Sequence, residues 1–139
     1  MSQENVEILR QVNAAANEHD LAAVAASYAP NIEWRDLQHG PDVPEVVHGI
    51  EAVKQLWSDW LDVIPDLRID ISEYVDLGDT IVCPTRWHGR GAGSGAPVDL
   101  QVVDVYELAD GKIVRATFGY ESKADALKAV EQYESRSAT

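Results

Sequence analysis

Apolar and polar positions alternate most regularly from Val98 to Leu108, and this pattern predicts a long β-strand. The stretch is rich in β-branched residues and is followed by the turn-forming residues 109–111. A period of two places four side chains on one face of the strand: Leu100, Val102, Asp104 and Tyr106. Asp104 therefore lies in mid-strand among apolar neighbours. Because a buried charge must be paired or neutralised, this carboxyl group requires a specific explanation.

Periodicity along the rest of the chain predicts further helices and strands. Apolar spacings of three and four residues predict helices over 4–18, 21–28, 50–64 and from 123 onward, with Asp20 and Ser122 as N-caps. Alternation predicts strands over 32–36, 67–76, 80–88 and 112–120. Residues 37–48 show no period and predict a loop, which includes His39 and is long enough to act as a lid.

This order of elements predicts an α+β fold with one curved antiparallel sheet and helices across a single face. We expect a single domain over residues 1–139, because no repeat or linker divides the chain.

Composition narrows the partners and the compartment. The chain has 11 basic and 24 acidic residues and a net charge of −13, which argues against nucleic acid or an anionic membrane as a partner. No apolar run is long enough to span a bilayer, and the polar N-terminus lacks the order of a signal peptide. Cys83 is the only cysteine, so we expect a cytoplasmic protein without disulfides. Histidine spacing predicts no metal site, and no cofactor motif is recognisable.

Several local strings together resemble the NTF2-like superfamily, in its SnoaL-like and ketosteroid-isomerase-like branches. The resemblance runs from about residue 6 to residue 127 and rests on these strings: Tyr28-Ala29, a strand ending in Asp36, His48-Gly49, residues 100–105, residues 110–113 and Tyr120. It implies a cone-shaped fold with a curved mixed or antiparallel sheet, an apolar cavity closed by the helices, and a homodimer formed through the outer sheet face.

The resemblance also implies site residues. Asp36 matches the isomerase's carboxylate base, and Asp104 matches the carboxylic acid that donates a hydrogen bond to the substrate oxyanion. The isomerase's oxyanion tyrosine is replaced here by Val12, and only part of the hydrolase Arg-x-Asp pair is present, at Arg86 and His88. The residues expected to line the ligand site are Trp34, Trp57, Trp60, Val12, Tyr120 and Val102. The two tryptophans of the third helix share one apolar stripe, a pattern more often typical of a structural core than of a ligand-binding surface, although a cavity-lining helix can combine both roles.

The two faces of the strand over residues 80–88 carry different side chains. By resemblance, we expect Arg86 and His88 to face the cavity beside Asp36 and Asp104. The more apolar set would then face outward together with Val103 and Val105 as a dimer interface, and its members are Ile81, Cys83, Thr85 and Trp87. A buried Arg86–Asp104 ion pair without chemistry is one alternative. His88 as the acid–base residue is another.

Two functions follow from this set of residues. The first is cofactor-independent acid/base proton transfer, as in an isomerase or cyclase, on a small apolar carbonyl compound, because two carboxyl groups with different pKa values supply a base and an acid. The second is a non-catalytic dimeric binding module for a small hydrophobic ligand.

Overall fold

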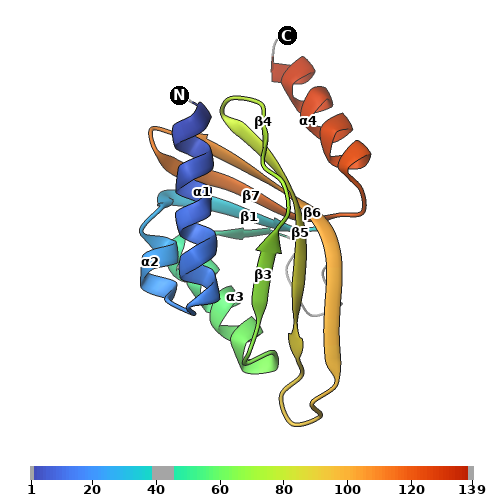
Figure 1. Ribbon diagram of the computed structural model, residues 1–139. Coiled ribbons are helices and arrows are strands. Elements are labelled where there is room, and N and C mark those ends of the chain that lie inside the picture. The colour runs from blue at the N-terminus through green and yellow to red at the C-terminus, as the bar shows by residue number, and fades with distance from the viewer. Residues whose placement is uncertain (1, 39–45, 138–139) are drawn as a thin grey trace.

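A curved sheet with helices on both of its faces forms the body of the protein (Figure 1). The structure is a computed structural model that describes residues 2–38 and 46–137. Its helices are α1 (Ser2–Asn17), α2 (Leu21–Ala25), α3 (Ile50–Val63) and α4 (Lys123–Ser137). Its strands are β1 (Tyr28–Asp36), β2 (Val46–His48), β3 (Arg68–Ile71), β4 (Val75–Asp76), β5 (Thr80–Arg90), β6 (Pro97–Ala109) and β7 (Lys112–Tyr120).

The strand order in the sheet is β2-β1-β7-β6-β5-β3, and β4 also pairs with β5. The β1–β7 pair is parallel and the other pairs are antiparallel, so the sheet is mixed. The predicted α+β fold with a curved sheet is confirmed. The first and last strands lie side by side and run in the same direction, so the end of β1 lies against the end of β7, which in turn pairs with β6.

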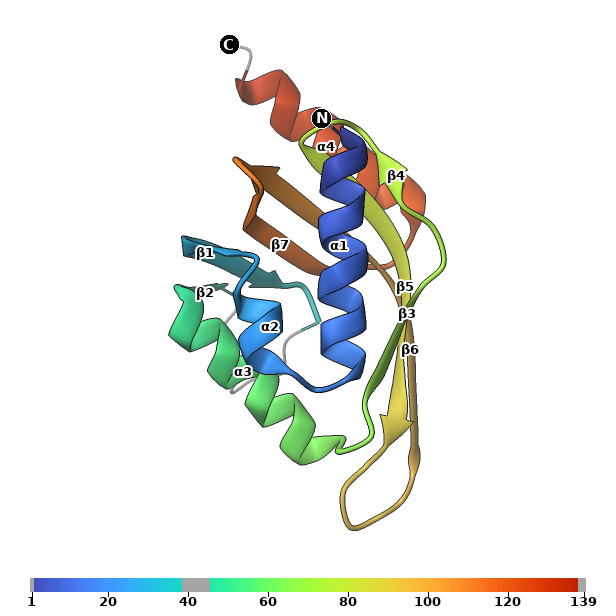
Figure 2. The same cartoon turned by 60° about the vertical axis from the view of Figure 1, so that its left-hand side comes forward.

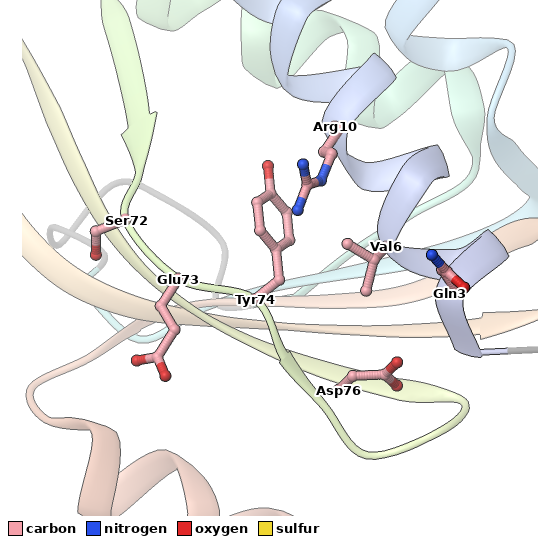
Figure 3. A pocket seen from close by; sticks show the side chains of 7 residues that line it. All are labelled: Gln3, Val6, Arg10, Ser72, Glu73, Tyr74 and Asp76. Carbon is pink, nitrogen blue, oxygen red and sulfur yellow. The ribbon is translucent and has the colours of Figure 1, made fainter.

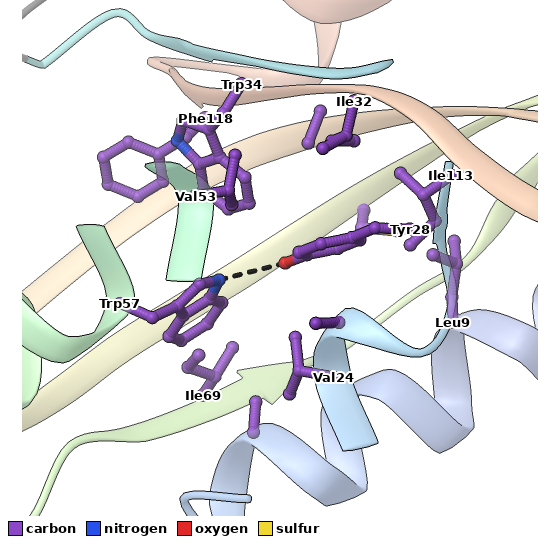
Figure 4. Close-up of a cluster of buried hydrophobic side chains, with 14 of the residues drawn as sticks. Leu9, Val24, Tyr28, Ile32, Trp34, Val53, Trp57, Ile69, Ile113 and Phe118 are labelled. Atoms are coloured by element: carbon purple, nitrogen blue, oxygen red, sulfur yellow. Dashed lines mark hydrogen bonds between the residues drawn. The ribbon is translucent and has the colours of Figure 1, made fainter. Parts of the chain in front are cut away.

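Helices α1, α2 and α3 cover one face of the sheet, which we call the inner face (Figure 2). Their apolar stripes meet the sheet in the main core, where Leu9 and Val53 pack near Ile32 and Ile113 (Figure 4). Polar contacts fix the end of α1 as well. Asn17 donates through Nδ2 to the Ile69 carbonyl (2.9 Å) and accepts from its N–H at Oδ1 (2.7 Å).

Helix α4 lies on the opposite, outer face, although the sequence predicted every helix on a single face. Its residues Ala126 and Val130 pack against Val82, Val103 and Val105 of the sheet. The predicted N-caps are confirmed, because Asp20 accepts from the Ala23 N–H (3.1 Å) and Ser122 Oγ accepts from the Asp125 N–H (3.0 Å). No helix in the described ranges is long and apolar enough to cross a bilayer.

The predicted loop over residues 37–48 is only partly a loop. Val46–His48 form strand β2, which pairs with β1 and was missed because three residues carry no readable period. The rest of the predicted lid, residues 39–45 with His39, lies outside the described residues. The predicted strand over 67–76 divides into β3 and β4, and both halves pair with β5.

The faces of β5 are the reverse of the predicted ones. Cys83 pairs directly with Asp104, and directly opposed residues of an antiparallel pair point to the same face. Ile81, Cys83 and Trp87 therefore belong to the inner core. The predicted outward apolar face does not exist, because these side chains lie under α1 and α3 while Val103 and Val105 lie under α4.

Candidate acid–base site

Asp104 lies on the inner face of β6 with only 1% of its surface exposed. Two protein groups donate hydrogen bonds to it, one to each oxygen. Trp87 Nε1 donates to Oδ2 (3.0 Å), and the Gly119 backbone N–H donates to Oδ1 (3.0 Å). The predicted inward orientation of this carboxyl is confirmed, whereas its partners are an indole and a backbone amide rather than Arg86 or His88.

A β-bulge in β7 supplies the Gly119 donor. Val103 pairs with Tyr120 and Val105 pairs with Thr117, so Phe118 and Gly119 together oppose the single residue Asp104. Gly119 has a φ of +103°, a conformation that residues with a side chain rarely adopt. Because a bulge disrupts the regular ladder, the Gly119 N–H is free to point at the Asp104 side chain.

Asp36 ends β1 and is 5% exposed. Its Oδ1 accepts a hydrogen bond from the Gln38 backbone N–H (2.8 Å). The parallel register pairs Asp36 with Phe118, the neighbour of Gly119 in the bulge. The structure thus brings together the two carboxyl groups that the sequence singled out, although they are 68 positions apart in the chain (104 − 36).

Burial is the main cause of an altered acidity at Asp104. It raises the pKa of this carboxyl to about 7, the hydrogen bonds from Trp87 and Gly119 oppose the rise, and the negative charge of Asp36 adds to it. At neutral pH Asp104 is therefore divided between a neutral and a charged form. A carboxyl in this state can donate a hydrogen bond as an acid, which an exposed aspartate at pH 7 cannot.

Aromatic rings surround Trp87, the donor to Asp104. Ring centroids within this cluster are 4.9 to 6.0 Å apart, mostly in edge-to-face arrangements. Its members are Trp34, Trp57, Trp60, Trp87 and Phe118. Trp57 Nε1 also donates to Tyr28 Oη (3.0 Å; Figure 4). The buried Trp34 Nε1 has no hydrogen-bond partner among the described residues.

Sequence reasoning placed three of these tryptophans in the site and missed two aromatic residues. Trp34, Trp57 and Trp60 were predicted, whereas Trp87 was assigned to the outer face and Phe118 was not singled out. The other predicted lining residues, Val102 and Val12, also pack in the inner core, the first fully and the second partly buried.

Tyr120 does not belong to this site. It packs against the outer cluster beneath α4, so its predicted role as an aromatic cavity residue is wrong. The cause is the bulge, because one extra residue in β7 reverses the alternation after Phe118. Phe118 occupies the inward aromatic position instead.

Arg86 and His88 also lie away from the two carboxyl groups, and the prediction that they share a pocket with them is wrong. Arg86 is exposed and binds Asp99 through two hydrogen bonds (2.9 and 2.8 Å). His88 Nε2 lies 2.7 Å from Asp70 Oδ2. The alternative of a buried Arg86–Asp104 ion pair is excluded by the same register, since these residues point to opposite faces of the sheet.

A separate surface pocket lies between the first half of α1 and the segment that joins β3 to β4 (Figure 3). Arg10 lies over the ring of Tyr74, 5.0 Å from its centroid. Glu73 in the same pocket binds Lys123 of α4 (3.0 Å). None of the predicted site residues lines this pocket, so it is distinct from the carboxyl pair.

Comparison with known proteins identifies the family of this chain. The profile of the SnoaL-like domain matches residues 9–116, so the chain belongs to the SnoaL-like family. Comparison with curated proteins finds no significant match.

Solved structures with the same fold extend the comparison. TerC co-crystallised with polyporic acid is 18% identical with a TM-score of 0.75, covering 92% of this chain and 98% of its own. A proposed isomerase from Bacillus subtilis is 21% identical with a TM-score of 0.74, covering 83% and 84%. A protein of ketosteroid isomerase-like fold from Catenulispora acidiphila, in complex with trimethylamine, is 16% identical with a TM-score of 0.73, covering 83% and 85%. At these identities the likeness concerns the fold.

Proposed function

We propose that this protein is a small-molecule enzyme of the SnoaL or ketosteroid isomerase type, which moves a proton at carbon in an apolar carbonyl compound without a cofactor. One observation carries the proposal: two buried carboxyl groups from different strands lie near each other, and burial, with a smaller contribution from the charge of Asp36, raises the pKa of Asp104 to about 7. An acid–base pair requires surroundings that give its two carboxyl groups different pKa values.

The two groups have different roles in this proposal. Asp36, held by the Gln38 N–H, is the base that takes a proton from the carbon next to the carbonyl group. Asp104 in its neutral form donates a hydrogen bond to the carbonyl oxygen as negative charge develops there. The proton then returns from Asp36 to carbon, so acid and base are both restored. The aromatic cluster supplies apolar surroundings in which such a hydrogen bond is strong.

A second function is favoured by a specific observation at Asp104. Both of its oxygens already accept hydrogen bonds from the protein, which is what a structural carboxyl needs. Val12 lies where the isomerase has its oxyanion tyrosine, so one catalytic donor is missing. In this alternative the protein binds a small hydrophobic ligand without transforming it, as the ligand-bound relatives also allow.

Deuterium exchange separates the two functions. Parent protein is incubated in deuterium oxide with cyclohexanone, an indanone and a tetralone, and incorporation at carbon is followed by mass spectrometry against a buffer blank. We expect the parent to accelerate exchange and Asp36→Asn to lose at least about 100-fold of that acceleration, because a positioned base contributes roughly that much. Asp104→Asn should lose less, since an amide still donates a hydrogen bond.

The matched control is Asp99→Asn, which removes an exposed carboxylate that pairs with Arg86. It should exchange as fast as the parent. Exchange by Asp36→Asn at the parental rate would contradict the catalytic proposal. Binding of the ketones without any exchange by the parent would favour the binding module.

We also propose a homodimer formed through the part of the outer face that α4 leaves open. Pro84, Arg86, Gln101 and Val103 line a shallow depression there, at the centre of β5 and β6. We expect sedimentation at micromolar concentration to give the dimer mass. Gln101→Glu, which adds charge to this face, should weaken the dimer, whereas Gln11→Glu on exposed α1 should not. A monomer mass for the parent would contradict this proposal.

A further inference from the structure

Gln38 connects the surroundings of the two carboxyl groups. Its backbone N–H donates to Asp36 Oδ1 (2.8 Å), and its side-chain Nε2 donates to the Gly119 carbonyl (2.8 Å). The Gly119 N–H in turn donates to Asp104 Oδ1 (3.0 Å). Gln38, two residues after the end of β1, therefore bonds directly to both Asp36 and Gly119, and the Gly119 N–H is one of the two donors to Asp104.

The adjoining residue strengthens the same connection. The Leu37 N–H donates to the Phe118 carbonyl (2.9 Å), which belongs to the same peptide unit as the Gly119 N–H. A peptide group that accepts at its oxygen becomes a stronger donor at its nitrogen, because hydrogen bonds in a chain polarise one another. Leu37 and Gln38 thus hold the carbonyl groups on both sides of the Gly119 N–H.

Close packing accompanies these hydrogen bonds. A Cβ atom added to Gly119 would lie 2.6 Å from Gln38 Cγ, so the Gln38 side chain covers the bulge. The Gly119 backbone therefore has little room to turn its N–H away from Asp104 while Gln38 stays in place.

We propose that Gln38 is a positioning residue that holds the two carboxyl groups as one hydrogen-bonded unit: it orients Asp36 through its backbone and fixes the Gly119 donor of Asp104 through its side chain. The proposal deepens the proposed function, on which its catalytic meaning rests. Its structural content concerns the free protein alone, so it can be tested without a substrate.

The other titratable groups beside Asp104 do not change charge near pH 7, where Asp104 titrates. Cys83 of β5 and Tyr106 of β6 face it, and burial raises the pKa of both groups, so they stay neutral near pH 7. Among the described residues, Asp36 of β1 is the other titratable group whose charge influences Asp104. Between pH 5 and pH 9, changes at Asp104 therefore reflect the carboxyl pair and its donors.

Gln38→Leu is the most direct variant, since leucine keeps the cover over Gly119 and removes the amide donor. With carboxyl groups of aspartate labelled with carbon-13, nuclear magnetic resonance gives the titration midpoint of Asp104. Because the Gly119 bond stabilises the charged form, loosening it should raise the midpoint by roughly half a pH unit. The Gly119 amide proton signal should move upfield as its hydrogen bond weakens. Gln11→Leu, on the exposed side of α1, should change neither. An Asp104 midpoint in Gln38→Leu that equals the parental one would overturn the proposal.

A second measurement needs no variant. In the parent, the Gly119 N–H and the Gln38 side-chain amide signals should titrate with the midpoint of Asp104. If either signal stays constant across that range, the connection is absent and the proposal fails, even where Gln38→Leu does not fold. If the parent does not catalyse ketone exchange but the Gly119 and Gln38 signals titrate with Asp104, only the proposed function is rejected. If the parent catalyses exchange but Gln38→Leu leaves the Asp104 midpoint unchanged, only the positioning role is rejected.

Discussion

Replacing Asp104 with asparagine is expected to change how the stability of the fold depends on pH. The folded-state pKa of Asp104, about 7, lies above the value of about 3.9 in an unfolded chain. Between these values the folded state holds the proton more firmly, so its contribution to stability is complete below pH 4 and is lost as the pH rises to 7. Between pH 5 and pH 8 the parent should lose about 3 kcal/mol through this group, and Asp104→Asn should not.

Denaturant unfolding of both proteins at several pH values measures this difference. At every pH, Asp104→Asn should also lower the free energy of unfolding by about 1–3 kcal/mol. Trp87 and Gly119 both donate to Asp104, and an amide offers only one acceptor oxygen. Only the pH-dependent part is diagnostic. Asp99→Asn is the control, since its pairing with Arg86 lowers the pKa of Asp99 and leaves it charged throughout this range. If the difference in free energy of unfolding between the parent and Asp104→Asn stays constant from pH 5 to pH 8, folding does not change the pKa of Asp104.

Gly119→Ala is expected to destabilise the protein by about 3 kcal/mol. Alanine at a φ of +103° is strained, which costs of order 1–3 kcal/mol. The added Cβ would also lie 2.6 Å from Gln38 Cγ and would displace the chain that orients the donor of Asp104. Thermal and denaturant unfolding give the size of the effect.

Gly111→Ala is the matched control for backbone strain. Gly111 has a φ of +76° in the β6–β7 turn, and a Cβ added there meets no atom within 4 Å. The excess cost of Gly119→Ala over Gly111→Ala measures the packing against Gln38. In a Gln38→Ala background this excess should shrink, because the clashing Cγ is gone. Equal costs for the two glycine variants would mean that the bulge does not constrain the site.

The sequence was sufficient for features that depend on local pattern. Strict alternation in β6 placed Asp104 on the inner face, and capping residues located the starts of α2 and α4. The order of elements predicted the α+β class, and the resemblance to the NTF2-like superfamily singled out Asp36. The strand alternation and the helix caps depend only on near neighbours in the chain.

Other features depend on register, which the sequence does not display. Both faces of β5 carry apolar residues, so only the pairing of Cys83 with Asp104 decides which side faces inward. Trp87 was therefore missed, while Arg86 and His88 were misplaced. A single extra residue at Gly119 similarly moved Tyr120 outward, and the signal that could have revealed it is a glycine in the interior of a strand.

The titration of the Asp104 carboxyl in the folded protein tests the central claim most directly. Carbon-13 resonance of labelled aspartate should give a midpoint near pH 7, and Asp36→Asn should lower that midpoint, because the charge of Asp36 raises the pKa of Asp104. A midpoint near that of an exposed aspartate, about 4, with no response to Asp36→Asn, would contradict the claim that these two carboxyl groups form an acid–base pair.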